Sequence, residues 1–507
     1  MDNLNSGILI LDFGSQYTQL IARRFREMGI YSEVHPYNYK TEIIKSRHPA
    51  GIVLSGGPRS VTDKEGFVRD IVELLAIAPI LGVCYGMQLI VHKLGGKVTS
   101  SNHREYGLSE VISKTSDLKN SKVWMSHGDV ISEIPKELKQ IAVSENGFPA
   151  ALESENILCL QFHAEVTHTE NGHLWFERFL QKTPRVQKLW KPKEILQSLT
   201  DKYKSEVKDD EVILCGLSGG VDSSVTATIL TKIFGPDRVM CVFVDTGLLR
   251  KNEFDEVLKS YDGLGLNVKG VRAEKDFFDA LKGKSDPEEK RIAIGHTFIK
   301  VFKAQIPKDK NIKWLAQGTL YPDVIESVSP TGSSVTIKSH HNVGGLPKDL
   351  NLKLIEPLRD LFKDEVRRIG KALDMPAYLI DRHPFPGPGL GIRILGEIHP
   401  EDVKILQEAD AVYIDEIRKA GLYDKIWQAF AVLLPIRAVG VQGDSRTYDK
   451  VVALRAVTSV DGMTAHWYPF EFEFLSRVSN RITNEVKGVN RVVYDVSSKP
   501  PGTIEWE

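Results

Sequence analysis

Residues 213–230 read ILCGLSGGVDSSVTATIL, and this stretch decides how the middle of the chain folds. The apolar run ILCGL is short and bounded by glycine, which is typical of a buried strand. The apolar and small residues from Val225 onward predict a helix packed on a sheet. Between the two, Gly219 and Gly220 allow a tight turn whose backbone N–H groups face one point. Together with nearby hydroxyls and the helix N-terminus, these groups predict an anion-binding loop.

The loop sequence SGGVDSS lacks the lysine that a Walker A phosphate loop requires. A second candidate, GKS at residues 283–285, lacks the leading glycine because Phe278 occupies that position. An ordinary strand–helix turn would use Gly-Gly but would not need the serines and the aspartate together. The loop resembles that of the ATP pyrophosphatase family, which cleaves ATP between its α- and β-phosphates and moves AMP onto an oxygen. The resemblance implies that ATP is bound by Ser218, Gly219, Gly220, Val221, Asp222, Ser223 and Ser224.

Within this loop, the Asp222 carboxylate and the hydroxyls of Ser218, Ser223 and Ser224 are expected to bind pyrophosphate. They would do so directly or through Mg²⁺, which prefers oxygen ligands and commonly binds one carboxylate together with substrate phosphates. We therefore expect Mg²⁺ to accompany ATP, with Asp222 as its protein ligand, and we expect no organic prosthetic group.

The overall composition excludes several classes of protein. With 507 residues, 42% apolar and 26% charged, the chain is long enough for more than one domain and resembles a soluble globular protein. A formal net charge of −1 gives no general field for nucleic acid or a membrane surface. The first residues lack a basic segment, and no run reaches the roughly 20 apolar residues of a membrane span. Four cysteines lie far apart without zinc-like spacing, so we expect a reduced, cytoplasmic protein.

Two segments suggest domain boundaries. Residues 182–204 are rich in charge and contain two prolines, which suits a linker between compact units. Residues 382–390 read RHPFPGPGL, and their prolines and glycines exclude a helix and a central strand. We therefore expect three domains, at residues 1–190, 191–383 and 384–507.

The first domain alternates strand-like runs with helical patterns, which predicts an α/β fold with a parallel sheet. The predicted strands are residues 7–12, 51–55 and 80–83, and the predicted helices are residues 17–28 and 67–76. In PILGVCYGMQLI, the small residues around Cys84 allow the sharp turn that presents a nucleophile above a sheet. The dipole of the following helix would stabilise the Cys84 thiolate. The alternative is an inert cysteine in the core.

Two further segments offer the partners that a cysteine nucleophile needs. The loop SGGPRSV follows a strand and offers backbone N–H groups at Gly56 and Gly57 for an oxyanion. The segment QFHAEVTHT contains His163 and Glu165, which could act as a base and as the carboxylate that orients it. The alternatives are a polar loop histidine or a metal pair of His163 and His168, whose spacing is one residue too long for successive helical turns.

These motifs resemble GxCxGxQ and HxE of the class I glutamine amidotransferase family. The resemblance implies a catalytic triad of Cys84, His163 and Glu165. It also implies an oxyanion hole formed by Gly57 and the Tyr85 amide. One departure is that many members read HPEV where this chain reads HAEV, and we expect this to change local rigidity but not the chemistry.

In the middle domain, two further strands are predicted to end in polar residues. RVMCVFVDTGL ends its apolar run at Asp245, and WLAQGTLYPD leads from a strand into a glycine-containing end. Because the carboxyl ends of parallel strands face the ligand crevice, we expect both ends near the nucleotide. The loop KSHHNVGG, which begins at Lys338, places a lysine beside two histidines. It suits a triphosphate better than a merely solvated charged loop.

The last part of the chain mixes helical and strand patterns and closes with KPPGTIEWE, a proline-stiffened segment that suits a site or an interface. Together, SGGVDSS, KSHHNVGG, HPFPGPGLGIR, QGDSRTY and KPPGTIEWE resemble the family of bacterial single-chain, glutamine-hydrolysing GMP synthetases over nearly the whole chain. The resemblance implies two successive parallel-sheet α/β domains, of the glutamine amidotransferase and the adenine-nucleotide α-hydrolase types. A small α+β dimerisation domain would follow them.

The same resemblance implies a reaction, the ATP-dependent amination of XMP to GMP through an adenyl-XMP intermediate. L-Glutamine would supply the ammonia, and AMP and pyrophosphate would be released. The expected partners are these three substrates and a second copy of the chain in a homodimer, with no nucleic acid and no membrane. Lys338 is the implied phosphate-loop residue, and the XMP contacts map to Arg250, Gln442, Lys499 and Glu505. Alternatively, Lys499 and Glu505 merely staple the closing segment to its own domain or to a partner chain.

Two other functions stay open on the sequence. One is another synthetase with the same loop, such as an amide-forming NAD synthetase, although that family pairs the loop with a nitrilase-type glutaminase. The other is a nucleotide- or glutamine-sensing protein that has lost turnover. Loss of Cys84, His163 or Asp222 would have supported the sensing protein, and all three are present.

Overall fold

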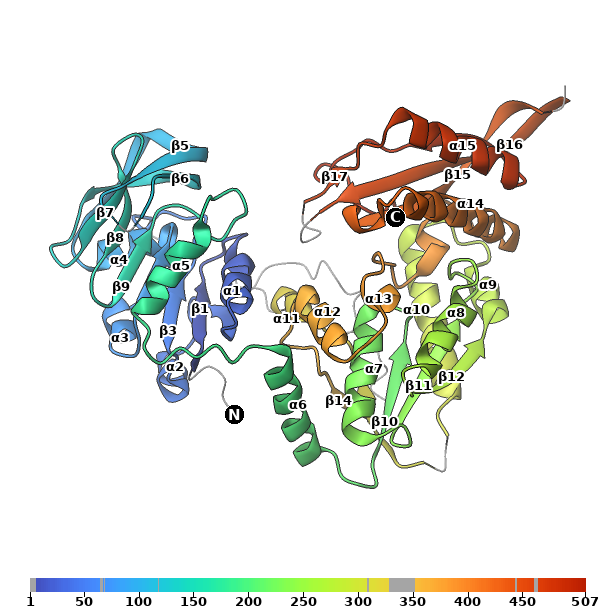
Figure 1. The fold of residues 1–507 in the computed structure, drawn as a ribbon, viewed down its shortest axis with the longest axis horizontal. Helices are drawn as coiled ribbons and strands as arrows, with labels where there is room; N and C mark the ends of the chain where they lie inside the picture. Colours follow the sequence, from blue (N-terminus) through green and yellow to red (C-terminus); the bar gives the residue numbers. More distant parts are fainter. Residues whose placement is uncertain are drawn as a thin grey trace. The chain divides into compact units, whose positions relative to one another are not determined.

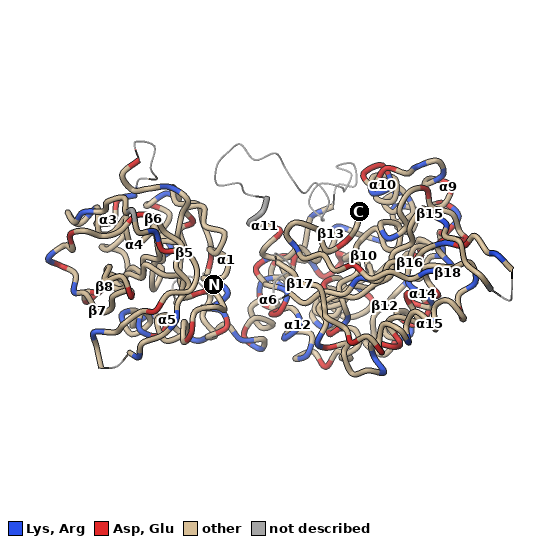
Figure 2. The backbone as a smooth tube through the Cα atoms, turned by 90° about the horizontal axis from the view of Figure 1, so that it is seen from above, with Lys and Arg blue, Asp and Glu red and all other residues tan. Residues whose placement is uncertain are grey.

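The computed structural model divides the chain into two compact units, one of residues 1–198 and 322–337 and the other of residues 199–321 and 338–507. The residues that it describes are 6–63, 67, 69–116, 118–307, 310–327, 352–442, 445–459 and 464–507. The three predicted domain limits stay a prediction. Lys and Arg residues are interspersed with Asp and Glu residues along each unit (Figure 2), so the near balance of charge seen in the sequence does not hide a segregation into two large patches. Among the described helices, none combines the length and hydropathy needed to cross a bilayer.

The first unit is built on a mixed sheet with the strand order β2-β1-β3-β4-β9-β8-β7-β5-β6 (Figure 1). Its parallel part contains β1 (Ile8–Asp12), β2 (Ser32–Pro36), β3 (Gly51–Leu54), β4 (Ile80–Val83) and β9 (Ile157–Leu160). Its antiparallel part contains β5 (Lys97–Ser113), β6 (Ser121–Glu133), β7 (Lys139–Ser144) and β8 (Pro149–Glu153). Because β4 and β9 are parallel neighbours, the residues that follow them meet at one edge of the sheet.

The helices of this unit confirm most of the predicted pattern. They are α1 (Thr18–Glu27), α2 (Thr41–Arg47), α3 (Ile71–Leu75), α4 (Tyr85–Lys93) and α5 (Gly172–Gln181). The predicted strands at residues 7–12, 51–55 and 80–83 are confirmed to within one residue, whereas the helix predicted at 67–76 is shorter. The sequence pattern does not predict β2, because this edge strand reads SEVHP and is mostly polar.

Residues 182–204, which the sequence predicts to link compact units, contain the boundary between the two units at residues 198 and 199, but their second half is helical. Residues from Pro192 onward form the helix α6 (Pro192–Glu206). Proline at the first position of a helix loses no hydrogen bond, so Pro192 starts this helix and does not break it. Ile195, Leu199 and Tyr203 recur every four residues and give α6 an apolar stripe.

The second unit contains a parallel sheet with the strand order β12-β11-β10-β13-β14. The strands are β10 (Val212–Leu217), β11 (Val239–Asp245), β12 (Asn267–Arg272), β13 (Ile312–Ala316) and β14 (Lys353–Ile355). Leu214 of β10 belongs to one buried apolar cluster, and Ile213 and Cys215 belong to another. Alternate residues of β10 therefore face two cores, which confirms the prediction of a strand buried on both faces.

Helices follow the strands of this parallel sheet, as the α/β pattern requires. They are α7 (Val221–Phe234), α8 (Glu253–Asp262), α9 (Glu274–Leu281), α10 (Pro287–Ala304), α12 (Lys363–Ala372) and α13 (Ala377–Ile380). Between β13 and β14 in the sequence lies α11 (Tyr321–Ser327), which belongs to the first unit from residue 322 onward. The segment RHPFPGPGL contains no α-helix and no strand, as predicted, and leads into the 3₁₀ turn η3 (Gly389–Ile392).

A second sheet of this unit is mixed. Its elements are α14 (Pro400–Lys419), η4 (Tyr423–Lys425), β15 (Gln428–Gln442), β16 (Ser445–Thr458), β17 (His466–Trp467), α15 (Phe472–Glu485) and β18 (Val489–Tyr494). The pair β15 and β16 is antiparallel, whereas β18 runs parallel to β16. One apolar cluster joins Leu214 of β10 to Leu454 of β16, so the two sheets share a continuous core. The predicted order of two parallel-sheet α/β folds and a smaller α+β part is confirmed.

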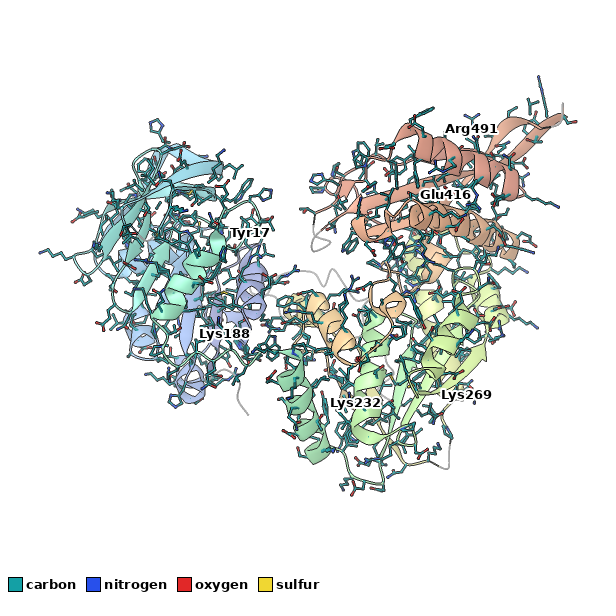
Figure 3. The ribbon with its side chains drawn as sticks, viewed as in Figure 1. Tyr17, Lys188, Lys232, Lys269, Glu416 and Arg491 are labelled. Atoms are coloured by element: carbon teal, nitrogen blue, oxygen red, sulfur yellow. The ribbon has the colours of Figure 1, made fainter. Side chains whose placement is uncertain are left out.

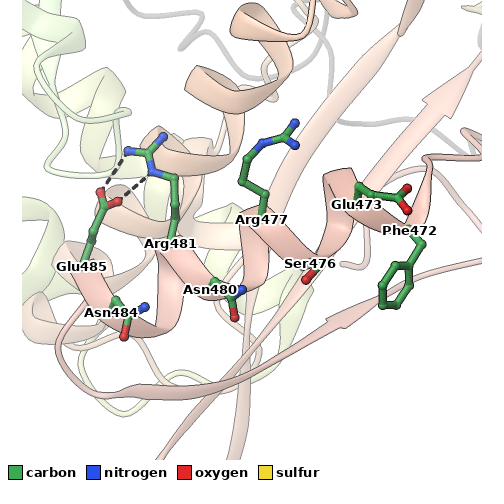
Figure 4. A pocket seen from close by; sticks show the side chains of 8 residues that line it. All are labelled: Phe472, Glu473, Ser476, Arg477, Asn480, Arg481, Asn484 and Glu485. Atoms are coloured by element: carbon green, nitrogen blue, oxygen red, sulfur yellow. Dashed lines mark hydrogen bonds and ion pairs between the residues drawn. The ribbon is translucent and has the colours of Figure 1, made fainter.

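The outer face of α15 forms a shallow hollow that ion pairs rigidify (Figure 4). It is lined by Phe472, Glu473, Ser476, Arg477, Asn480, Arg481, Asn484 and Glu485. Arg481 pairs with Glu485 on its own helix and with Glu416 of α14, which is labelled in Figure 3. These pairs tie α15 to α14.

Candidate functional site

Cys84 stands at a sharp turn between β4 and α4. Its φ of 52° lies in the left-handed region, which is strained for a residue with a side chain and is typical of functional turns. A Cβ added at Gly86 would lie 2.3 Å from the Leu54 carbonyl oxygen, and one at Gly82 would lie 2.8 Å from the Gly86 backbone. Only glycine fits at either position. The structure thus confirms the predicted strand–turn–helix context of Cys84.

His163 and Glu165 lie buried beside this turn. His163 Nδ1 is 2.6 Å from Glu165 Oε1, and the Cys84 thiol is close enough to the imidazole to raise its pKa. The hydrogen bond that Cys84 Sγ itself donates goes to the Ser126 carbonyl, at 3.6 Å. Because Nδ1 faces the carboxylate, Nε2 remains for the thiol. The ring of Tyr17, labelled in Figure 3, stands edge-on to His163 with centroids 4.8 Å apart. The Trp124 carbonyl accepts a hydrogen bond from the backbone N–H of His163 at 2.9 Å, which fixes the backbone position from which the imidazole projects.

The environment of His163 favours its protonated form. Burial lowers the pKa of His163, but the charge and the hydrogen bond of Glu165, together with the nearby Cys84 thiol, outweigh burial. The net effect raises the pKa of His163 well above its usual range. A protonated imidazole beside Cys84 favours the thiolate and can deliver a proton to a leaving group.

Gly57 and Tyr85 meet at the side of the turn. A Cβ at Gly57 would lie 2.8 Å from the Phe13 carbonyl oxygen and 3.4 Å from Tyr85 Cγ, so only glycine allows this approach. Within the described part of the chain, no hydrogen-bond acceptor engages the amide of Gly57 or that of Tyr85. The Tyr85 amide opens α4, where the helix leaves its first N–H groups unpaired. Both amides can therefore donate to an oxyanion.

The loop SGGVDSS connects β10 to α7. Gly219 has a φ of 73°, as its predicted tight turn requires. The hydroxyls of Ser218 and Ser223 lie 3.1 Å apart, and the Ser218 amide donates to the Ser223 hydroxyl at 3.2 Å. Val221 is buried and begins the helix, so it can offer only its backbone N–H. Ser218 is exposed and Ser223 half-buried, which leaves both hydroxyls at the surface of the loop.

One predicted ligand in this loop needs correction. The side chain of Ser224 is fully buried. Its hydroxyl donates to the Gly220 carbonyl at 2.7 Å and lies 2.8 Å from the Tyr261 hydroxyl. Ser224 thus holds the loop in shape from the core side, and its hydroxyl does not face a phosphate. A sequence pattern alone cannot separate a hydroxyl that faces the ligand from one that faces the core.

Asp222 lies in the first turn of α7, and the two oxygens of its carboxylate differ in their surroundings. Its Oδ2 lies 3.2 Å from Lys363 Nζ at the start of α12. Its Oδ1 is buried, and among the described residues no group forms a hydrogen bond with it. An unpartnered carboxylate oxygen in a phosphate loop fits a cation such as Mg²⁺. Sequence reasoning missed Lys363, because a lysine at a helix start carries no distinctive local signal.

Arg250 follows β11, and its guanidinium contacts three other residues of the second unit. Nε lies 3.5 Å from Asp410 Oδ2, and Nη2 donates to the Ala429 carbonyl at 3.4 Å. The guanidinium lies 5.2 Å from the ring centroid of Phe385, which belongs to the HPFPGPG segment. The proline-rich segment and Arg250 are therefore in contact.

Glu505 is linked to the same ring through Arg393. Its carboxylate accepts two hydrogen bonds from Arg393, at 2.8 and 3.1 Å, and one from Gln428 at 2.6 Å. Arg393 lies 5.1 Å from the centroid of Phe385. Sequence reasoning missed Arg393 and Gln428, although Arg393 is the last residue of HPFPGPGLGIR. The contacts of Glu505 support the stapling alternative for this residue, while its carboxylate keeps a fifth of its surface exposed.

The remaining predicted residues are only partly described. Lys499 exchanges backbone hydrogen bonds with Ala465, at 2.8 and 3.1 Å, so the tail (residues 499–507) is anchored where it begins. Gln442 closes β15, and its side chain lies outside the described residues. Lys338 and the whole KSHHNVGG loop also lie outside them. Their predicted contacts stay predictions.

Three family models match successive parts of the chain. Residues 9–183 match the class I glutamine amidotransferase family, residues 193–298 match NAD synthase, and residues 415–506 match the GMP synthase C-terminal domain. A GMP synthase [glutamine-hydrolyzing] of Bdellovibrio bacteriovorus is 60% identical over 99% of this chain and 100% of its own length. The chain belongs to the glutamine-hydrolysing GMP synthase family. This membership confirms the family predicted from the motifs.

Other proteins resemble this chain over all or part of its length. The protein of Vibrio parahaemolyticus with the same name is 53% identical, over 99% of this chain and 98% of its own length. The solved structure of a GMP synthase subunit from Thermoplasma acidophilum is 26% identical and covers 35% of this chain and 93% of its own, with a TM-score of 0.32. The NAD synthase match is confined to the loop-bearing middle of the chain, so it does not favour the rival synthetase over the whole length.

We predict that Glu165→Gln destabilises the protein in a pH-dependent way. The folded pKa of His163 is raised, so the stability gained from its proton is fully present below its unfolded pKa of about 6.5 and is lost as the pH rises through the folded pKa. Breaking this buried pair should cost about 3 kcal/mol near pH 6 and less near pH 9, as measured by urea unfolding.

The matched control is Glu133→Gln, which breaks the exposed pair with Lys97 in the same unit and should change stability little at either pH. A loss of stability in Glu165→Gln that is the same at both pH values would contradict the assignment of the charge to His163.

Proposed function

We propose that this chain is a working GMP synthase, in which Cys84 releases ammonia from glutamine and the loop at residues 218–224 activates XMP with ATP. The observation that carries the proposal is the presence in one chain of two intact sites: a buried Cys84–His163–Glu165 set and a phosphate loop with hydroxyls at its surface. A glutamine-sensing protein without turnover would have no need of the cysteine nucleophile and its buried histidine–carboxylate pair.

At the first site, the proposed step is acyl transfer. The Cys84 thiolate attacks the amide carbon of glutamine while the amides of Gly57 and Tyr85 stabilise the oxyanion. His163 protonates the departing nitrogen, so ammonia leaves and a glutamyl thioester forms. Water, deprotonated by His163, then attacks the thioester, which releases glutamate and restores the thiol. Glu165 keeps the imidazole oriented throughout through its 2.6 Å contact.

At the second site, the proposed step is adenylyl transfer. The oxygen at C2 of XMP attacks the α-phosphorus of ATP, the bond to the β-phosphate breaks, and pyrophosphate leaves. The loop amides and the hydroxyls of Ser218 and Ser223 hold the departing phosphates. Lys363 and Asp222 lie at the same edge, and we include Lys363 among the phosphate ligands. Ammonia then attacks C2, AMP departs, and GMP remains.

Mg²⁺ and the XMP contacts complete the proposal. Asp222 would hold the cation through its buried Oδ1, and the bound ion would neutralise charge on the β- and γ-phosphates. Arg250, Gln442 and Lys499 would contact XMP, with Glu505 oriented by Arg393 at the edge of the same region. The four cysteines, all within the described residues, are free thiols, which supports a reducing cytoplasmic compartment. The direct test of the proposed function is to measure the formation of GMP and pyrophosphate when XMP, ATP and glutamine are supplied together.

We predict that Cys84→Ala abolishes glutamine-dependent GMP formation but retains activity with ammonium salts. The substitution removes the nucleophile of the first site and leaves the second site untouched. Cys159→Ala, which changes another buried cysteine of the same unit, should retain both activities. Loss of the ammonium-dependent activity in folded Cys84→Ala protein would show that the two sites do not divide the reaction as proposed.

We predict that Asp222→Ala removes GMP formation with either nitrogen source, because adenylyl transfer precedes amination. Losing a charged ligand of the leaving group should lower the rate at least about a hundredfold, the scale of a deleted transition-state contact. The readout is pyrophosphate release with XMP and ammonium. Asp237→Ala, at an exposed position between α7 and β11, is the control and should turn over normally. Normal turnover by Asp222→Ala would remove this residue from the site.

We further propose that the chain forms a homodimer through the β15–β16 hairpin. Val439, Val441 and Tyr448 are apolar but 55%, 72% and 57% exposed, and Val439 pairs directly with Tyr448. β15 is also an edge strand of its sheet. An exposed apolar edge of this kind favours burial against a copy of itself, since a two-fold interface is self-complementary.

We predict that Val439→Asp shifts the molar mass in solution from twice 56.8 kDa to 56.8 kDa, as measured by light scattering on a size-exclusion column. Tyr378→Asp changes a similarly exposed aromatic residue on α13 and should leave the dimer intact. If Val439→Asp kept the dimeric mass, the interface would lie elsewhere.

A further inference from the structure

The carboxylate of Glu253, the first residue of α8, contacts groups from both nucleotide regions of the second unit. Its Oε1 pairs with Arg382 Nη2, and its Oε2 accepts the backbone N–H of Arg250 at 2.9 Å. The other terminal nitrogen of Arg382, Nη1, donates to the carbonyl of Gly219 in the phosphate loop. One chain of contacts thus runs from Gly219 through Arg382 and Glu253 to Arg250.

The members of this chain of contacts are largely buried and contact one another directly. The side chain of Glu253 is 7% exposed and that of Arg382 is 16% exposed. At Gly219, an added Cβ would lie 3.5 Å from Arg382 Nη1 and 3.7 Å from Glu253 Oε1. The planar guanidinium reaches the carbonyl and the carboxylate with separate nitrogens, a geometry that lysine cannot reproduce.

The segment that contains Arg382 is also held on its other side. The next residue, His383, accepts the Ala429 amide at Nδ1, at 3.2 Å. The carbonyl of Ala429 in turn accepts from Arg250 Nη2. Arg250 is therefore held at its backbone by Glu253 and at its guanidinium through the strand that His383 binds. A shift of the phosphate loop would reach Arg250 by both routes.

Adenylyl transfer makes the distance between the two nucleotides critical. The attacking oxygen of XMP and the α-phosphorus of ATP must approach to roughly 3 Å with the leaving pyrophosphate in line. The loop at Gly219 sets the position of the pyrophosphate, and Arg250 helps to set that of XMP. A rigid connection between the two would make the binding of one nucleotide favour the correct position of the other.

We propose that Glu253 and Arg382 are positioning residues that couple the ATP loop to the XMP contact Arg250, so that the two nucleotides bind cooperatively. The inference rests on the proposed function of these two regions. If Glu253 and Arg382 were only a structural ion pair, they would stabilise the fold but would not couple the two nucleotides.

The test measures binding coupling without turnover. The Kd of XMP is determined by calorimetry, with Mg²⁺ present, in the absence and in the presence of saturating α,β-methylene-ATP, whose α–β bridge cannot be cleaved. The wild-type protein should bind XMP at least about fivefold more tightly with the analogue, the lower end of typical coupling. Glu253→Gln places an amide NH₂ against Arg382 or the Arg250 amide, so the ratio should fall to about one.

Asp255→Asn is the matched control. Asp255 lies in the same first turn of α8 but pairs with Arg272 at the surface, where both side chains are more than half exposed. This variant should keep the wild-type coupling. Arg382→Lys keeps the charge but loses the second nitrogen, and it should lose coupling as Glu253→Gln does. It serves as the test if Glu253→Gln does not fold.

Three outcomes would overturn the proposal. These are a wild-type protein that binds both nucleotides without coupling, a folded Glu253→Gln or Arg382→Lys variant that keeps the wild-type ratio, and an Asp255→Asn variant that loses it equally. A lowered thermal midpoint with unchanged coupling would reduce the pair to a structural role. A wild-type protein that binds neither XMP nor the ATP analogue would instead refute the proposed function, which separates the two failures.

Discussion

Both candidate sites depend on one constraint. In each, a single residue with positive φ makes the sharp turn between the end of a parallel strand and the start of a helix. Cys84 does this between β4 and α4 with a φ of 52°, and Gly219 does it between β10 and α7 with a φ of 73°. The turn leaves the first N–H groups of the helix unpaired and pointing outward. The first turn exposes a thiol to the site, and the second exposes several backbone amides and serine hydroxyls. The same backbone solution therefore supports two different chemistries.

Buried cations give the tail its fixed place. Lys290, Arg393 and Arg455 have no exposed side-chain surface, and each contacts the end of the chain. Lys290 pairs with Glu507, and Arg393 with Glu505. Arg455 donates to three backbone carbonyls between residues 497 and 504. Removing one partner of a buried ion pair typically costs several kcal/mol, so these pairs stabilise the tail in its place.

Contiguous motifs were predictable, whereas pairings across the fold were not. SGGVDSS and the turn at Cys84 each place their strand, turn and helix within about twenty residues, so local pattern suffices. Lys363 meets Asp222, which lies 141 positions earlier in the chain, only because the start of α12 lies beside the start of α7. No periodicity reports such a contact. The inward hydroxyl of Ser224 was missed for a related reason, since its direction depends on Tyr261, a residue of another helix.

His383 shows how the proline-rich segment can be held without adding charge. The Ala429 amide can only donate, so Nδ1 of His383 must accept, and Nε2 must carry the proton that the Tyr423 carbonyl accepts at 2.9 Å. Burial is the main cause that lowers the pKa of His383 to about 4, and the charge of Arg250 acts in the same direction. Its ring stacks on Tyr423 at 3.9 Å. A protonated His383 would lose the bond to β15 and repel Arg250. The histidine therefore holds the proline-rich segment in its neutral form, and the positive charge of this region comes from the arginines.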